Sequence, residues 1–473
     1  MFRKAVRGPS GPVAPWTNLS VVSIIEVQWN PRPAWRICQM KSTVPLSRVR
    51  ALSVVLSLFL LVSCGVGSRD RGAQGADVEL EAVTEDMYTV GTFSGEDWET
   101  FGRVADVDFD ASGNLYILDE ANFRVVVLDR GGAPVRMIGS QGDGPGELSG
   151  PMSAAILDDG RLVVYDMGFP GAFEIFDQEG SFVSSTTVDP LKGMPGELLL
   201  PLGGGRMATT GGMTLRMASQ GEPEEPPEDA HLRDIDVFAL DGSDKGVLYR
   251  AWNLPPEEDV DEFTASNEQG RTEFTLGLQR LRAFRLPLHI GVLPDGLVAV
   301  VDSVGYRVKL IAMDGTVAGV IGRDIAPELV TEAIEEAERA RLTEEMAGSP
   351  SPTIRLMGGL EAISGEAAEQ LRAQMLALVE DMVFPEEIPV VAAMGVDGEG
   401  QLWIARTAPG GSGDGPIDIM TSEGDYVGTL PPDAPRIPDA FGPDGLMAYV
   451  ETDEMDVPSV RVIRLVSLEP GNR

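Results

Sequence analysis

A pattern of four short β-rich runs separated by turns recurs along this chain, and it constrains the fold more than any other feature. The clearest copy lies within 102–148, where the runs cover 104–109, 115–118, 125–128 and 135–138. Turn-forming residues separate the runs, among them Asp110, Gly113 and the pair Gly131 and Gly132. Four antiparallel strands of this length within about 45 residues form one blade of a β-propeller.

Weaker copies of the pattern follow at 153–188, 198–210 with 235–251, 288–323, 390–430 and 438–466. The last copy holds three runs, and an extra run at 86–95 precedes the first copy. We therefore expect an all-β, six-bladed propeller over 81–470, in which an N-terminal strand completes the last blade. Such closure leaves no unpaired sheet edge at the joint of the ring.

Two segments between the fourth and fifth copies have the composition of helices. The segments at 329–348 and 365–381 are rich in Ala, Leu, Glu and Arg, and Thr331 and Ser364 are candidate N-caps. In the second segment Leu371, Met375 and Leu378 belong to an apolar stripe. We predict an α-helical insertion at about 325–384 between blades 4 and 5. It is either a packing cover on the ring or a lid or partner surface.

An apolar segment at 51–62 precedes Cys64 and follows the basic residues Lys41, Arg48 and Arg50. It is too short to cross a bilayer as a helix, which takes about 20 residues, and it has the length of the core of an export signal. The sequence Leu61-Val62-Ser63-Cys64 then resembles the lipobox of bacterial lipoproteins. The resemblance implies cleavage before Cys64 and lipidation of its thiol and new amino end. The alternative is a buried strand with an inert cysteine.

This interpretation divides the N-terminal region into three parts. We expect residues 40–63 to form the signal peptide, which would begin at Met40, and we hypothesise that residues 1–39 come from an over-long gene model. Residues 64–80 are small and polar at first and form a flexible tether. We expect a bacterial envelope protein that faces the periplasm or the exterior. Gly65 after the cysteine favours the outer membrane in a Gram-negative cell.

Several phrases of the sequence resemble a known group of proteins. They are DASGNLYILDEANFRVVVLD at 110–129, FPEEIPVVAAMGVDGEGQLWI at 384–404 and DEMDVPSVRVIRL at 453–465. Together they resemble the exported six-bladed β-propellers of bacteria, which are NHL-like and TolB-like. The resemblance covers about 86–468 and implies the architecture, but it implies no activity.

The innermost strands of a propeller line its central channel with alternate side chains. Aligning the repeats places Asp106, Asp108, Ser153 and His289 on the channel wall, with Arg103 and Arg285 near its mouth. Such a group could bind a polar ligand or take part in acid–base chemistry. The alternative is a hydrogen-bonded, water-filled channel. The strand-ending residues Asp119, Asp166 and Asp302 recur with the repeat, and we interpret them as turn caps.

The composition limits the possible functions. The net charge of −37 disfavours binding to nucleic acid. Cys38 and Cys64 lie outside the repeats, and the chain has two histidines, so we predict no zinc cluster and no metal ligands. The run from Asp106 to Asp110 resembles a calcium loop, but Ala111 stands where that loop needs glycine. We expect no cofactor, and calcium in the channel is the alternative.

We therefore expect a lipid-anchored, extracytoplasmic propeller that acts as a binding or scaffold module. Its partners would be the membrane, through Cys64, and a protein or a small polar ligand. The alternative is an enzyme of the propeller lactonase or lyase kind with a metal in the central channel. Those enzymes gather several Asn, Asp, Glu or His side chains around the ion, whereas the aligned channel positions here are mostly small or apolar.

Overall fold

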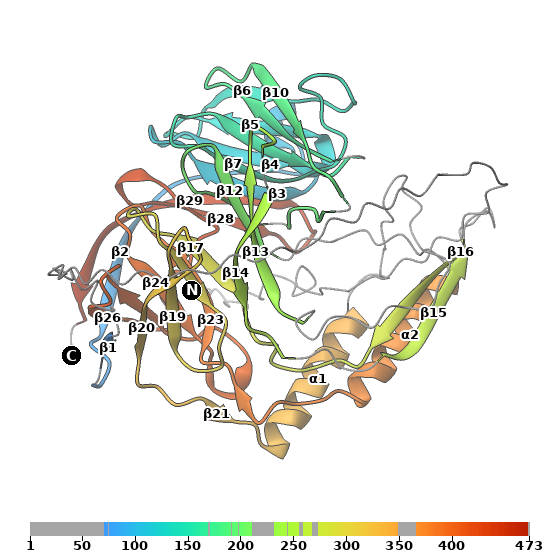
Figure 1. Cartoon of the computed structure of the whole chain (residues 1–473), viewed down its shortest axis with the longest axis vertical. Helices are drawn as coiled ribbons and strands as arrows, with labels where there is room; N and C mark the ends of the chain where they lie inside the picture. Colours follow the sequence, from blue (N-terminus) through green and yellow to red (C-terminus); the bar gives the residue numbers. More distant parts are fainter. Residues whose placement is uncertain are drawn as a thin grey trace, which may run out of the picture.

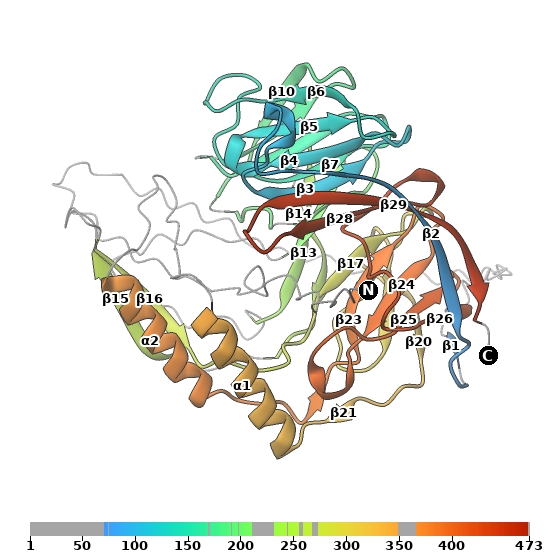
Figure 2. The same ribbon diagram turned by 180° about the vertical axis from the view of Figure 1, so that it is seen from behind.

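The computed structural model describes residues 71–471 except 74, 169–170, 191, 197, 211–230, 244, 255–258, 267–272 and 349–365. These residues include six sheets that each contain four antiparallel strands and are arranged around a common centre (Figure 1, Figure 2). The innermost strand of blade 6 contacts that of blade 1, which closes the ring. The six-bladed propeller predicted from the repeat is therefore confirmed.

Blades 1 to 3 follow the order of the chain, and each begins with its innermost strand. Blade 1 contains β3 Val104–Phe109, β4 Leu115–Asp119, β5 Arg124–Leu128 and β6 Pro134–Ile138. Blade 2 contains β7 Pro151–Ile156, β8 Leu162–Asp166, β9 Ala172–Phe176 and β10 Phe182–Thr187. Blade 3 contains β11 Leu199–Pro201, β12 Arg206–Thr210, β13 Arg233–Ala239 and β14 Lys245–Ala251.

Blades 4 to 6 repeat this order with two additions from the N-terminal segment. Blade 4 contains β17 His289–Val292, β18 Val298–Val301, β19 Arg307–Ile311 and β20 Val317–Arg323. Blade 5 contains β23 Val391–Val396, β24 Leu402–Arg406, β25 Ile417–Met420 and β26 Tyr426–Leu430. Blade 6 contains β27 Ala440–Phe441, β28 Leu446–Thr452 and β29 Pro458–Pro470, completed by β2 Leu80–Val90.

The hydrophobic core lies between neighbouring blades. Strands β4 and β5 are buried along their whole length, and alternate residues of β4 pack against opposite neighbours. Ile117 packs in a cluster with Ala448 of blade 6, and Leu118 packs in a cluster with Val164 of blade 2. Because both faces of such a strand are covered, its sequence is a continuous apolar run. Each fully buried aliphatic side chain contributes about 1.5–3 kcal/mol.

Strand β2 closes the ring, as the repeat predicts. It pairs antiparallel with β29 from Leu80 opposite Pro470 to Val90 opposite Val460. The strand begins earlier than the expected 86–95 and ends at Val90. Gly91 follows with φ of 114°, and a Cβ there would lie 2.5 Å from the Pro458 carbonyl oxygen. This close approach requires glycine and ends the strand.

The part of the expected tether that the structure describes lies against the ring. Strand β1 Arg71–Ala73 adds to the outer edge of blade 4 by pairing parallel with β20. The Val78 carbonyl accepts a hydrogen bond from the Thr429 amide at 2.7 Å, on the outer strand of blade 5. Residues 71–80 therefore cover the outer edges of two blades, and a free tether can extend only as far as residue 70. Covered edges are protected from pairing with other chains.

A buried ionic cluster holds this N-terminal segment between blades 4 and 5. Arg323 donates to Asp77 at 2.8 Å and to both carboxylate oxygens of Asp418 at 3.0 Å. Arg406 donates to the second oxygen of Asp77 at 2.6 Å, and the Thr429 hydroxyl donates to Asp418 at 2.6 Å. Burial opposes ionisation of Asp77, but the hydrogen bonds and charges of Arg406 and Arg323 outweigh it and lower the pKa of Asp77.

The predicted helical insertion between blades 4 and 5 is confirmed. Helices α1 Glu332–Gly348 and α2 Glu366–Glu380 lie between β20 and β23. The short strands β21 Glu328–Leu329 and β22 Glu387–Ile388 pair at the base of the insertion. The Thr331 hydroxyl accepts a hydrogen bond from the Ile334 amide at 3.4 Å, in agreement with its predicted capping role. The other expected cap, Ser364, lies outside the described residues.

A second insertion, which the sequence did not lead us to expect, lies between blades 3 and 4. It is the hairpin of β15 Asp259–Ser266 and β16 Glu273–Gln279, which runs beside α2 in both views (Figure 1, Figure 2). The two insertions are joined at their bases, where the Ala283 amide donates to the Val383 carbonyl at 2.9 Å. A small apolar cluster that includes Met346 and Val379 packs there.

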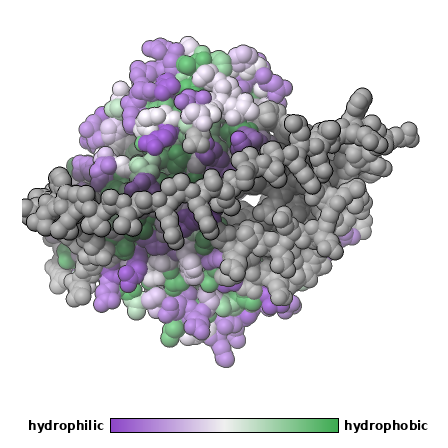
Figure 3. All heavy atoms as spheres, viewed as in Figure 1, coloured by the Kyte–Doolittle hydropathy of each residue, from purple (hydrophilic) through white to green (hydrophobic). Residues whose placement is uncertain are grey.

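The described surface is largely polar in the view of Figure 3, with smaller apolar areas between hydrophilic side chains. Neither α1 nor α2 combines the length and the apolar character needed to cross a bilayer, and this statement covers the described part of the chain.

Candidate functional site

The two ends of the ring differ. The innermost strands begin at one end, where the connections between blades also lie, and we call this end the insert face. Both long insertions belong to such connections, from β14 to β17 and from β20 to β23. At the opposite face, the first and second strands of each blade are joined by short turns such as those at 110–114 and 157–161.

The channel-wall carboxylates of blade 1 bind the backbone of blade 2. Asp106 accepts hydrogen bonds from the amides of Val107 at 2.9 Å and Ala154 at 3.0 Å. Asp108 repeats the arrangement with two amides at 2.8 Å each, one of them that of Ile156. Each carboxylate thus bridges β3 and β7, one oxygen to each strand. This geometry gives both residues a role in joining blades, and ligand binding by them stays a prediction.

Burial perturbs both groups. Burial raises the pKa of Asp106 to about 7 against the lowering effect of its backbone hydrogen bonds, and the charge of Asp108 raises it further. Burial likewise raises the pKa of Asp108 to about 6. The two carboxyls therefore titrate close to neutral pH.

The other candidates of the channel wall separate into two groups. Ser153 is fully buried on β7, and its hydroxyl has no hydrogen-bond partner among the described residues. Arg103, at the mouth on the blade 1 side, pairs with Glu120 at 3.0 Å and is largely exposed. These two belong with the aspartates of blades 1 and 2, whereas His289 and Arg285 lie on the side of blades 4 and 5.

His289 is the first residue of β17, and it forms a hydrogen bond with the backbone of Ala392 on β23. This bond joins blade 4 to blade 5. The Nε2 atom of His289 has no partner among the described residues. Burial lowers the pKa of His289 to about 4, and the nearby charge of Arg233 lowers it further. The imidazole is therefore neutral at physiological pH. His289 and Asp106 each bond to the next blade rather than to one another.

The strand-ending aspartates are turn caps, as predicted. Asp119 accepts from the Gly102 amide at 3.0 Å, and Asp166 accepts from the Gly150 amide at 2.6 Å. Asp302 accepts from the Trp252 amide at 2.9 Å. In each case a buried carboxylate fixes a connection on the insert face.

Sequence reasoning did not identify Arg406, although a signal was present. Strand β24 ends in Arg406 where the second strands of blades 1, 2 and 4 are capped by aspartate. The arginine pairs with Asp77 and Asp418 instead. A basic residue at an acidic position of the repeat indicated a charged partner from elsewhere in the chain.

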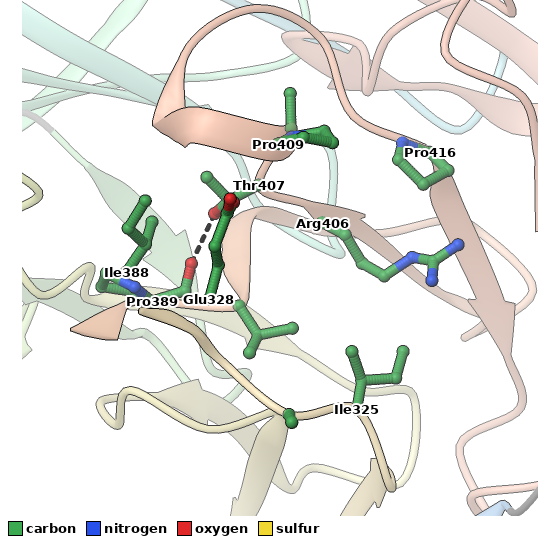
Figure 4. A pocket seen from close by; sticks show the side chains of 11 residues that line it. Ile325, Glu328, Ile388, Pro389, Arg406, Thr407, Pro409 and Pro416 are labelled. Carbon is green, nitrogen blue, oxygen red and sulfur yellow. Dashed lines mark hydrogen bonds between the residues drawn. The ribbon is translucent and has the colours of Figure 1, made fainter. Parts of the chain in front are cut away.

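Two adjoining cavities open on the insert face between the helical insertion and blade 5. The larger, of about 210 Å³, is lined by Ile325, Glu328 and Pro416 among others (Figure 4). Its wall is fixed by the Thr407 hydroxyl, which donates to the Pro389 carbonyl at 2.5 Å. The guanidinium of Arg406 points away from this hydrogen bond (Figure 4).

The smaller cavity, of about 140 Å³, shares Ile388, Pro389 and Thr407 with the larger one. It is also lined by Arg285 and by Ala392, whose backbone bonds to His289. Of the six predicted site residues, Arg285 lines this cavity, and His289 is joined to its wall through the hydrogen bond with the Ala392 backbone. Pro389 belongs to the phrase at 384–404 that carries the family resemblance, but nothing in the sequence placed it or Thr407 in a cavity wall.

The described chain is thus a six-bladed β-propeller whose two long insertions lie on one face, together with the adjoining cavities beside Pro389. Within the described residues, no three His, Cys, Asp or Glu side chains are placed to hold a metal ion. Its sequence matches no model of a protein family and no curated protein.

Solved structures do match the chain at low identity. A candidate exported protein from Bacteroides fragilis is 12% identical with a TM-score of 0.41, covering 82% of this chain and 96% of that one. A DUF4221 family member from Bacteroides vulgatus is 10% identical with a TM-score of 0.41, covering 84% and 100%. A gluconolactonase from Xanthomonas campestris is 14% identical with a TM-score of 0.31, covering 81% and 89%. At these levels of likeness the matches define no activity for this chain.

Proposed function

We propose that this chain is a lipid-anchored, extracytoplasmic propeller whose insert face binds a protein or a small polar ligand. The observation that carries the proposal is the concentration of features on one face. The hairpin, the helix pair and both cavities belong to connections at the insert face, whereas short turns form the opposite face. Loops carried by a rigid scaffold are the usual place for binding residues.

The alternative of metal-dependent catalysis in the channel has less support. The carboxylates that line the wall at Asp106 and Asp108 already accept backbone hydrogen bonds on both oxygens. These bonds hold both side chains against blade 2, and within the described residues no third carboxylate, imidazole or thiol is placed with them to hold an ion. This arrangement weighs against a channel ion at this position.

The anchoring part of the proposal depends on Cys64, which lies outside the described residues. Six residues separate it from Arg71, where β1 begins to pair with blade 4. A fully extended chain of this length spans at most about 25 Å. Lipidation of Cys64 would therefore keep the rim of blade 4 close to the bilayer.

The binding part can be tested by photo-crosslinking in intact cells. A photoreactive residue is placed at Glu336 on α1 or Ala373 on α2, both exposed, and in controls at the exposed Ser112 and Asp159 in turns of the opposite face. We expect both insert-face positions to give a crosslink to a common species that the opposite face does not give. Equal crosslinking from all four positions, or from the controls alone, would contradict the proposal.

A further inference from the structure

Arg285 is an arginine whose charge is not compensated by the described chain. It lies on the rim of the smaller cavity and makes no hydrogen bond or ion pair to the described residues. The protein packed around it and the charge of nearby Arg282 lower its pKa. Arg285 is exposed at this rim. Its guanidinium can therefore bind an anion at short range, through charge-assisted hydrogen bonds that replace those to water.

The backbone beside this arginine is held in an unfavourable conformation. Phe284 has φ of 46°, in the left-handed region that a bulky residue rarely adopts. Its ring packs at 6.1 Å from Phe384 and lies over Gly411, where a Cβ would be 2.2 Å from a ring atom. Strain that neighbouring packing maintains is typical of functional sites. Here it keeps Phe284 in the wall of the cavity, directly before Arg285.

The two cavities beyond Arg285 together offer apolar surface to a small ligand. Pro287, Pro389 and Val391 line the smaller one, and the Thr407 hydroxyl is already bonded to the Pro389 carbonyl. The larger cavity continues on the other side of Pro389 and is also mainly lined by aliphatic and proline side chains. A ligand here therefore meets Arg285 at the rim and a mixed polar and apolar lining in the smaller cavity. In the larger cavity it meets a mainly apolar lining that also contains Glu328 and Arg406.

We propose that this cavity binds a carboxylate carried on a small apolar body, with Arg285 as its anion partner. The inference rests on the proposed binding role of the insert face and names the chemistry of its ligand. The carboxylate can come from a free organic acid or from the C-terminus of a peptide. Both present the planar pair of oxygens that a guanidinium binds through two hydrogen bonds.

Matched pairs of acids and amides test the proposal by calorimetry on the mature chain. One pair, 3-phenylpropionate and its amide, represents a free organic acid. The other pair, N-acetylleucine and its amide, represents the C-terminus of a peptide. We expect at least one acid to bind about tenfold or more tightly than its amide, because a hydrogen bond to a charged group is stronger than one to a neutral group. The pair that shows this preference identifies the source of the carboxylate.

The variant Arg285→Gln should remove the preference for the acid, and Arg285→Lys should retain part of it. The matched control is Arg206→Gln, which removes an exposed arginine at the opposite face and should change nothing. Thermal unfolding of each variant establishes that the fold is kept. Acids that bind no better than their amides, or a preference that survives Arg285→Gln, would overturn the inference. Either result would leave intact the evidence for a protein partner that crosslinks to α1 and α2. The two proposals can therefore fail separately.

Discussion

Replacing Arg323 with methionine tests whether the buried ionic cluster holds the N-terminal segment on the ring. The Arg323 side chain is 3% exposed, and its partner Asp418 is fully buried. Removing one member of a buried pair costs about 3–5 kcal/mol, because the other charge remains buried without compensation. Asp418 keeps the Thr429 hydroxyl at 2.6 Å and Arg406 at 3.6 Å. We therefore expect the lower end of this range, about 3 kcal/mol.

The assay is urea denaturation followed by tryptophan fluorescence, with Arg461→Met as the matched control. Arg461 pairs with Glu451 at 3.0 Å, but its side chain is 36% exposed. Such a surface pair contributes about 0–1 kcal/mol. Hydrogen exchange adds a local readout, since the amides of Val78 and Thr429 join the N-terminal segment to blade 5 and should exchange faster in Arg323→Met. Equal losses of stability in the two variants, with unchanged exchange at Val78, would refute the reasoning.

Three further predictions concern the caps, the channel and the anchor. Asp119→Ala should lower the free energy of unfolding by about 3 kcal/mol, because it removes a fully buried carboxylate that binds Nε of Arg124 and caps the Gly102 amide, although Arg124 keeps its ion pair with Asp97. Asp129→Ala in an exposed turn should cost about 1 kcal/mol, and chemical denaturation compares the two variants. Asp106 has a pKa raised to about 7, so its folded form holds a proton that the unfolded chain releases. The free energy of unfolding should therefore fall as pH rises from about 4 to 7, by about 1 kcal/mol per pH unit. Denaturation at several pH values should show that this free energy depends less steeply on pH in Asp106→Asn than in the unchanged protein. Cys64→Ala should abolish incorporation of labelled palmitate and move the protein from the membrane to the soluble fraction, and continued labelling would contradict lipidation of that residue.

The blades could be predicted from the sequence because their physical signal is strong. The middle strands of blade 1 are covered on both sides, so LYIL and VVVL are continuous apolar runs between turn residues. The first blade followed from such runs, the closing strand from the missing fourth run of the last copy, and the helical insertion from its composition and its apolar stripe. Strand β2 was placed too late because most of its residues are exposed. A strand with little covered surface gives no apolar run that marks where it begins.

The candidate site was harder to predict because it depends on contacts between distant segments. Asp106 and Asp108 could be placed on the channel wall from alternation alone, but their bonds to blade 2 depend on the distance between two blades. The cavity beside Arg285 is built from the connections around residues 285, 389 and 407, which share no sequence pattern. Phe284 gave no signal either, since a left-handed backbone is expected at glycine.

Hydrogen exchange tests the central claim, which is that the insert face is the binding surface. Exchange is compared between the protein in its native envelope and the same protein purified in detergent. The account predicts slower exchange in the envelope at 280–288, 332–348 and 407–411, all on the insert face, and no change in the turns at 110–114 and 158–161. Protection confined to the turns of the opposite face would contradict the account.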